Sequence, residues 1–211
     1  MNEYHKIQTV FKRNPENKFR TLLEGEYAIP EFEYLKDNLW VFTEKVDGTN
    51  IRIMWNHETK RLTFGGKTDR AQIQASLFKE LQEMFFVQRF EQSYPETSMC
   101  LYGEGYGAKI QKGGGNYRPD QSFVLFDVKI GEWWLKRDDV ESVAFQLGIE
   151  IVPVLSEGSL SEMVWRVKDG FLSQWGAFQA EGLVARPIIE LTARNGQRII
   201  TKIKCKDFRC P

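Results

Sequence analysis

Two strand-like runs, Leu39–Thr43 and Ile51–Trp55, flank a short polar connection that contains Asp47-Gly48. The first run is rich in aromatic and β-branched residues, and the second alternates large apolar residues with others, as strands do. An Asp-Gly pair between two such runs is a typical hairpin turn. The sequence therefore predicts a β-hairpin, with Lys45 and Asp47 on the same side of the end of its first strand.

Short strands and helices alternate along the rest of the chain. A change to helical periodicity predicts one helix over 71–90, and helix caps at Asp138 or Asp139 and at Ser159 predict two more, ending near Gly148 and Gly170. Further strands are predicted at Arg61–Phe64, Met99–Tyr102, Phe123–Ile130, Ile151–Leu155, Gly182–Arg186 and Arg198–Lys206. These patterns predict the α+β class, with antiparallel β-sheets and flanking helices.

The size and composition allow one well-buried domain, which we expect to span residues 1–211. No apolar run approaches the roughly 18 residues of a membrane span, and the N-terminus lacks the apolar core of a signal peptide. We therefore expect a cytoplasmic monomer with no membrane partner. The three cysteines, Cys100, Cys205 and Cys210, lack metal-site spacing and are predicted to be reduced thiols.

The charge of the whole chain does not favour a nucleic-acid partner, because 29 basic residues balance 29 acidic ones. The distribution of charge along the chain is less even. Six basic residues stand against one acid between Arg194 and Arg209, and three stand against none between Gly105 and Pro119. These two segments could form a basic surface despite zero net charge.

The last predicted strand has a basic face. Alternation puts Arg198, Lys202, Lys204 and Lys206 on one side, and Ile199, Thr201, Ile203 and Cys205 on the other. An edge strand protected from aggregation by lysines would show the same pattern. The alternative is that these lysines face a polyphosphate.

The connection Glu44-Lys45-Val46-Asp47-Gly48-Thr49-Asn50 resembles the nucleophile motif of the covalent nucleotidyltransferases. This superfamily includes ATP-dependent DNA ligases, RNA ligases and mRNA capping enzymes, and this form of the motif is most similar to RNA ligases of the repair and editing branch. Four further stretches resemble the family's motifs III, IIIa, IV and V in chain order: Leu101–Glu104, Phe123–Asp127, Glu181–Arg186 and Lys202–Phe208. The stretch 107–113 is also similar to that branch. The resemblance implies a nucleotidyltransferase catalytic domain with an ATP-grasp-like fold.

The resemblance also implies roles for individual residues. Lys45 would attack the α-phosphorus of ATP to form lysyl-AMP, after losing the proton that a lysine carries at neutral pH. Lys204 and Lys206 would favour the neutral amine and hold the phosphate oxygens. The nucleotide-binding set would be Glu44, Asp47, Asn50, Lys67, Arg70, Glu104, Phe126, Glu181 and Lys202. Within it, Phe126 would stack on the base, with Phe123 as the alternative. Lys67 or Arg70 stands in place of the motif Ia arginine, which leaves that contact unassigned.

The resemblance implies a divalent metal, Mg²⁺ or Mn²⁺, near Glu181, Glu104 and Asp47. The glycine-rich loop that carries Lys109, Lys112 and Arg118 would reach the nucleic-acid backbone, unless it is a loop with no role. Because the sequence ends three residues after Phe208, we expect no C-terminal OB or helical domain, so the chain would be either a minimal ligase or a catalytic-domain fragment. The predicted activity is ATP-dependent ligation of RNA, at nicked duplexes or paired ends. A DNA ligase core, or an end-binding module without turnover, is the alternative.

Overall fold

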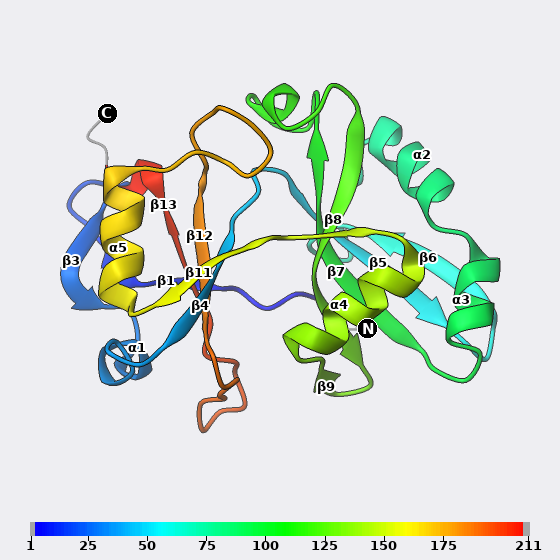
Figure 1. The fold of residues 1–211 in the computed structure, drawn as a ribbon, viewed down its shortest axis with the longest axis horizontal. Helices are drawn as coiled ribbons and strands as arrows, with labels where there is room; N and C mark the ends of the chain where they lie inside the picture. The colour runs from blue at the N-terminus through cyan, green and yellow to red at the C-terminus, as the bar shows by residue number, and fades with distance from the viewer. Residues whose placement is uncertain (1–2, 209–211) are drawn as a thin grey trace. The chain divides into compact units, whose positions relative to one another are not determined.

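The computed structural model describes residues 3–208, which form an α+β fold of largely antiparallel sheets with a few helices (Figure 1). The chain divides into two compact units. The first unit comprises Asp47–Val152 with the N-terminal residues up to His5, and the second comprises Lys6–Val46 with the residues from Pro153 onward. Two compact units are compatible with one domain, so the single domain over 1–211 stays a prediction.

A six-stranded sheet forms the centre of the first unit, in the order β10-β8-β7-β5-β6, with β9 paired to β8. All neighbours are antiparallel except β10 and β8. The strands are β5 (Thr49–Asn56), β6 (Arg61–Gly65), β7 (Met99–Gly107), β8 (Gln121–Ile130), β9 (Trp133–Trp134) and β10 (Glu150–Ile151).

Three helices cover one face of this sheet: α2 (Ala75–Met84), α3 (Val87–Ser93) and α4 (Arg137–Leu147). The core beneath them contains alternate residues of β5, Ile51, Ile53 and Trp55, together with Leu77 and Leu81 of α2. Figure 1 shows α4 running over β8. The intervening residues of β5 lie on the opposite face, which leaves that face for polar side chains.

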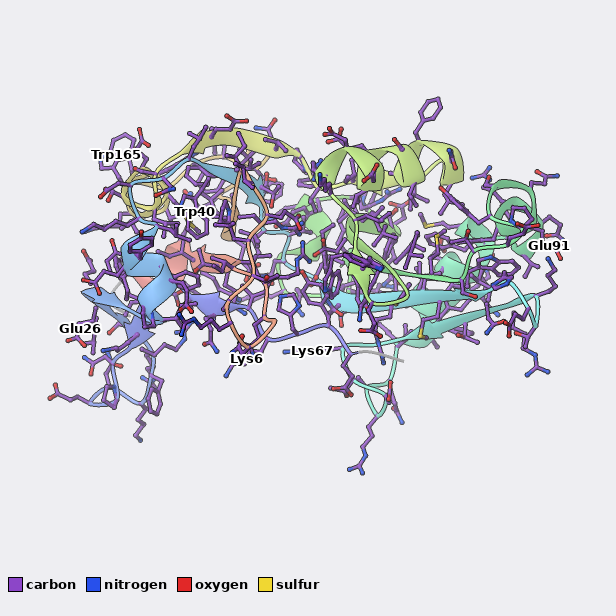
Figure 2. All side chains as sticks on the ribbon, turned by 90° about the horizontal axis from the view of Figure 1, so that it is seen from below. Lys6, Glu26, Trp40, Lys67, Glu91 and Trp165 are labelled. Carbon is purple, nitrogen blue, oxygen red and sulfur yellow. The ribbon has the colours of Figure 1, made fainter. Side chains whose placement is uncertain are left out.

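The second unit is built on a five-stranded sheet in the order β1-β13-β12-β4-β11. Its helices α1 (Pro30–Tyr34) and α5 (Leu160–Asp169) pack on a core that includes Trp40, Phe42 and Leu183. Trp40 is fully buried in this core, whereas Trp165 of α5 points outward (Figure 2). The strands are β1 (Gln8–Thr9), β4 (Trp40–Glu44), β11 (Val154–Gly158), β12 (Gly182–Pro187) and β13 (Thr201–Lys204), with a separate pair, β2 (Phe11–Arg13) and β3 (Leu22–Tyr27).

The predicted hairpin over 39–55 is wrong. β4 pairs with β11 and β12 in the second unit, whereas β5 pairs with β6 and β7 in the first. Gly48 does not form a hairpin turn. Instead it lets the backbone pass close to Gly105, because a Cβ on Gly48 would lie 2.3 Å from the Gly105 carbonyl oxygen. The segment between the strands is therefore a crossover from one sheet to another.

Two other predicted elements are each divided in two. The predicted helix over 71–90 is α2 and α3, separated where Phe85 and Phe86 adopt extended backbone, and Phe85 turns into the core against Phe123. The predicted strand Ile151–Leu155 is divided at Pro153 into the end of β10 and the start of β11. Proline lacks the N–H that a continuous ladder needs.

Other predictions are confirmed. The capping box at Ser159 and Glu162 begins α5, and Gly148 ends α4 in the left-handed conformation, although Lys136 occupies the N-cap of α4 in place of either aspartate. Cys100 and Cys205 are buried free thiols, and Cys210 lies outside the described residues. None of the helices in residues 3–208 has the length and apolar character needed to span a bilayer.

The last strand is not at an edge, which contradicts the alternative of an edge strand protected by lysines. β13 lies between β1 and β12, and it is shorter than predicted. Its alternation is as predicted, because Thr201 and Ile203 are buried while Lys202 and Lys204 are partly exposed.

Candidate active site

Lys45 follows the last residue of β4 and is held on both its backbone and its side chain. Its N–H donates to the Gly182 carbonyl at 2.9 Å, which continues the pairing of β4 with β12. Its Nζ lies 2.6 Å from Glu181 Oε2 and 3.4 Å from the Val46 carbonyl oxygen. One-fifth of the Lys45 side chain is exposed, and its amine is oriented by these two contacts.

Lys204 binds the other oxygen of the same carboxylate. Its Nζ lies 2.5 Å from Glu181 Oε1, because the β12–β13 register places Lys204 beside Gly182. Two ammonium groups therefore bind one carboxylate. We call Lys45, Glu181 and Lys204 the Lys45 cluster. Its side chains are 10–21% exposed, and low exposure strengthens the attraction between an ammonium group and an anion.

Of the other predicted basic residues, Lys202 lies within β13, whereas Arg198 and Lys206 lie beyond its ends. Lys202 precedes Lys204 by two residues on the same face and is half-buried. Lys206 is exposed in the 3₁₀ turn η2 (Cys205–Asp207). Arg198 lies before the strand and pairs with Glu190 at 3.2 Å.

Asp207 fixes the turn that follows Lys204. Its Oδ2 accepts the backbone N–H of Lys204 at 3.2 Å, and its Oδ1 lies 3.2 Å from Arg13 Nη2. Asp207 is buried, whereas the Arg13 side chain is one-third exposed. Sequence reasoning missed Arg13 and Asp207, since nothing links positions 194 residues apart before the sheet is known.

Glu44 points away from the Lys45 cluster, as alternation along β4 requires. It is almost fully buried, and burial raises the pKa of its carboxyl group, partly offset by hydrogen bonds from the Gln174 N–H and the Ser173 side chain. The Gln174 N–H donates to Oε2 at 2.8 Å, while Oε1 is buried without a partner. Glu44 thus anchors the loop that leads to Glu181.

Three predicted nucleotide-binding residues come together on the first unit. The crossover continues into this unit at Asp47, whose N–H donates to the Tyr117 hydroxyl at 3.1 Å. Asn50 of β5 stands opposite Glu104 of β7 in the strand register. Asn50 Oδ1 is buried and has no hydrogen-bond partner, so it could accept a hydrogen bond from a ligand.

Phe126 lies at a β-bulge between β7 and β8. Tyr102 is opposite Asp127 and Gly103 is opposite Leu125, so Phe126 is the extra residue. A bulge re-aims a side chain, and Phe126 is only half-buried, with Tyr4 at 5.1 Å edge-on between ring centroids. The alternative, Phe123, is wholly buried in the core beside Phe85 and is not available to a base.

Lys67 and Arg70 are both exposed on the turn after β6; Figure 2 labels Lys67. This turn is held by the buried Arg52, whose Nε donates to the Gly66 carbonyl at 2.8 Å and whose Nη2 pairs with Asp69 at 2.8 Å. Arg52 Nη1 is buried without a partner. Arg52 was missed as a site residue, although its alternation with Ile51 and Ile53 was the signal that could have found it.

The glycine-rich loop is more ordered than its sequence suggested. Gln111 Nε2 donates to the Gly48 carbonyl at 3.0 Å, and a short 3₁₀ turn, η1 (Gly114–Asn116), follows. Lys109 and Lys112 are exposed, but Arg118 is paired with Asp120 and lies over the Tyr106 ring. Two of the three predicted basic residues thus remain open to a partner.

The sequence profile of the RNA ligase family matches residues 38–204, a range that contains the Lys45 cluster, the crossover and the bulge. The chain belongs to the RNA ligase family. A comparison of the sequence with curated proteins finds no match.

Solved RNA ligase structures have the same fold. A Naegleria gruberi RNA ligase mutant with ATP and Mn superposes with a TM-score of 0.66 at 18% identity, covering 85% of this chain and 54% of that one. The same ligase with PPi gives 0.67 at 18% identity, covering 94% and 54%. An apo mutant gives 0.68 at 16% identity, covering 98% and 60%. This chain thus spans little more than half the length of these ligases, and the likeness shows the fold.

Membership of the RNA ligase family implies a divalent metal, which needs side chains, phosphates or waters as ligands. Residues 3–208 contain no group of three or more His, Cys, Asp or Glu side chains arranged to hold a metal ion. Both oxygens of Glu181 already bind lysine ammonium groups. These residues do not fit a metal centre built from protein ligands alone. The assignment of Glu181, Glu104 and Asp47 to a metal stays a prediction.

Proposed function

We propose that this chain is an ATP-dependent RNA ligase that joins 5′-phosphate and 3′-hydroxyl ends through a lysyl-AMP intermediate. The observation that carries the proposal is the Lys45 cluster, in which a partly exposed amine is 2.6 Å from a carboxylate that also binds Lys204. Membership of the RNA ligase family supports it, as do relatives of the same fold solved with ATP or AMP and Mn.

The first step would be nucleotidyl transfer to Lys45. The neutral amine attacks the α-phosphorus of ATP, a P–N bond forms, and the bond to the β-phosphate oxygen breaks to release pyrophosphate. Glu181 orients the amine and lies within hydrogen-bond reach of the proton that it must lose. Lys204 supplies a fixed positive charge to the oxygens of the α-phosphate, where negative charge develops.

The remaining predicted residues would bind the nucleotide. Phe126 offers a half-buried ring for the adenine, and Asn50 and Glu104 offer acceptors for the ribose hydroxyls. Lys67 or Arg70 would contact phosphate from the turn that Arg52 holds. Mg²⁺ or Mn²⁺ would arrive with ATP and be held mainly by phosphate and water, because Mg²⁺ gives up its waters reluctantly.

The later steps act on the RNA ends. The AMP of lysyl-AMP passes to the 5′-phosphate, which frees the amine, and the 3′-hydroxyl then attacks that phosphate with AMP as the leaving group. Lys109 and Lys112 would contact the RNA backbone, whereas Arg118 is already paired with Asp120. We propose a cytoplasmic monomer as the acting species.

The decisive experiment is sealing of nicked duplexes that carry RNA or DNA on each side of the nick, with ATP or GTP and a divalent metal. Sealing that requires ATP, and RNA at the 3′-hydroxyl side, is the expected result. Equal sealing of an all-DNA nick would indicate a DNA ligase core, and preference for GTP would indicate the capping class. A chain that binds nicks without sealing any of them would be an end-binding module.

A further inference from the structure

The connection between β2 and β3, residues 14–21, has an unusual backbone. Lys18 and Phe19 have φ values of +60° and +62°, which place two consecutive non-glycine residues in the left-handed region. That region is unfavourable for residues with a Cβ, and structures retain such residues where the surroundings fix them, often at binding sites. We call residues 14–21 the Lys18 turn.

A dense set of hydrogen bonds fixes the Lys18 turn. The Phe19 N–H donates to the Asn14 carbonyl at 2.8 Å, and Asn17 Oδ1 accepts the Arg20 N–H at 3.0 Å and the Thr21 N–H at 3.4 Å. The Phe19 carbonyl accepts from Arg13 Nη1 at 3.2 Å. The shape of the turn is therefore set before any partner arrives, which lowers the entropy cost of binding.

The fixed turn displays two cations and an aromatic ring to solvent. Lys18 and Arg20 are exposed, and 59% of Phe19 is exposed although it is apolar. Within residues 3–208 neither Lys18 nor Arg20 forms an ion pair. By contrast, Lys12 pairs with Glu26 and Lys168 with Glu24 in the same unit. Figure 2 shows the turn projecting from the second unit near the labelled Glu26.

Arg13 ties this turn to the strand end that carries Lys204. The same guanidinium that holds the Phe19 carbonyl pairs through Nη2 with Asp207, and Asp207 accepts the backbone N–H of Lys204. All of these residues belong to the second unit. The turn is thus mechanically linked to a residue proposed to bind phosphate.

We propose that the Lys18 turn is a contact site for an RNA strand, with Lys18 and Arg20 on successive phosphates and Phe19 stacked on a base. Exposed basic and aromatic side chains on a preformed loop have the chemistry that binds single strands, since every base has a face that can stack. The choice of RNA rests on the proposed ligase function. The turn lies outside the sequence range matched by the RNA ligase profile.

The test compares charge-matched variants of the full chain for binding of a labelled single-stranded RNA oligonucleotide across a salt series. The double variant Lys18→Ala/Arg20→Ala should reduce the salt slope by about 1.4, from roughly 0.7 for each of two phosphate contacts. Phe19→Ala should weaken binding by about tenfold without changing the slope, and Phe19→Leu should not restore stacking. The control Lys12→Ala/Lys168→Ala removes the same charge from paired lysines and should leave the slope unchanged.

Equal losses in the two double variants, unchanged binding by the Lys18 and Arg20 variant, or no RNA binding by the unmodified chain would each overturn the proposal. Lysyl-AMP formation, measured on the same proteins, separates this result from the ligase proposal. If no lysyl-AMP forms but the variants still differ in RNA binding as expected, the ligase proposal is rejected and the RNA contact site stands. If lysyl-AMP forms normally but all variants bind RNA equally, the contact site is rejected and the ligase proposal stands.

Discussion

Lys45 and Lys204 bind opposite oxygens of the same carboxylate, Glu181, at 2.6 and 2.5 Å. The arrangement couples a residue at the end of β4 to one at the end of β13, with β12 between them. It holds two like charges close together, and Glu181 offsets part of their repulsion. A phosphate that arrives beside Lys204 would bring further negative charge to these ammonium groups.

Substitution Lys204→Ala should lower the rate of lysyl-AMP formation by about 10²- to 10³-fold, the usual loss when one preorganised donor to a developing charge is removed. The rate is measured by single-turnover labelling with ATP. Lys168→Ala is the matched control, because that lysine is in the same unit but pairs with Glu24. An equal loss in both variants would show that the effect is not local to the Lys45 cluster.

Arg13 should act as a positioning residue for Lys204 through Asp207. Arg13→Ala frees the turn after β13, so the rate of lysyl-AMP formation should fall several-fold while the KM for ATP changes little. Arg13→Lys should restore only part of the rate, because an ammonium cannot bridge Asp207 and the Phe19 carbonyl as the forked guanidinium does. Full activity in Arg13→Ala would contradict this role. Thermal unfolding of each variant separates a local effect from a general loss of stability.

Glu44 should make stability depend on pH. Because burial raises the pKa of Glu44 in the folded state, the folded chain holds this proton more tightly, and the contribution of Glu44 to stability is greatest below the ordinary carboxyl pKa of about 4.3. Stability then falls as the pH rises through the raised value. Glu44→Gln keeps an acceptor for the Gln174 N–H and removes the titration. The difference in melting temperature, variant minus unmodified chain, should therefore become more positive from about pH 4 upward and then level off. A difference in melting temperature that does not change with pH would show that burial does not raise the pKa of Glu44.

Gly48→Ala should destabilise the chain by about 1–3 kcal/mol, as overpacking does when backbone must shift. The added Cβ would meet the Gly105 carbonyl oxygen and the Glu104 side chain. Gly115→Ala is the control, because no heavy atom lies within 4 Å of a Cβ built there. Urea unfolding of both variants measures the difference. Equal stability of the two would mean that β5 and β7 do not require glycine at the crossover.

Much of the fold follows from local sequence patterns. The period-two alternation of Ile51, Ile53 and Trp55 predicted the buried face of β5, and the spacing of Ser159 and Glu162 predicted the start of α5. Each of these signals spans only a few residues, so local geometry decides it. The proximity of Lys45, Glu181 and Lys204 was expected only because the chain resembles a family with those motifs.

The errors arose where long-range pairing overrode a local signal. Asp47-Gly48 has the composition of a hairpin turn, but the strands on either side do not pair with each other. β4 pairs with β12, and β5 pairs with β7. The bulge that turns Phe126 depends on the register of β7 against β8. The role of Arg52 depends on a turn that forms only once β5 and β6 are paired. None of these can be derived from one strand alone.

The proposed function requires that Lys45 become covalently linked to AMP. The direct measurement is incubation of the full chain with ATP labelled in the α-phosphate and a divalent metal, followed by mass mapping of the modified peptide. The expected result is one adenylyl group on Lys45, released on addition of pyrophosphate and absent from Lys45→Ala. Label on another residue, label that survives Lys45→Ala, or no label on the unmodified chain would contradict it.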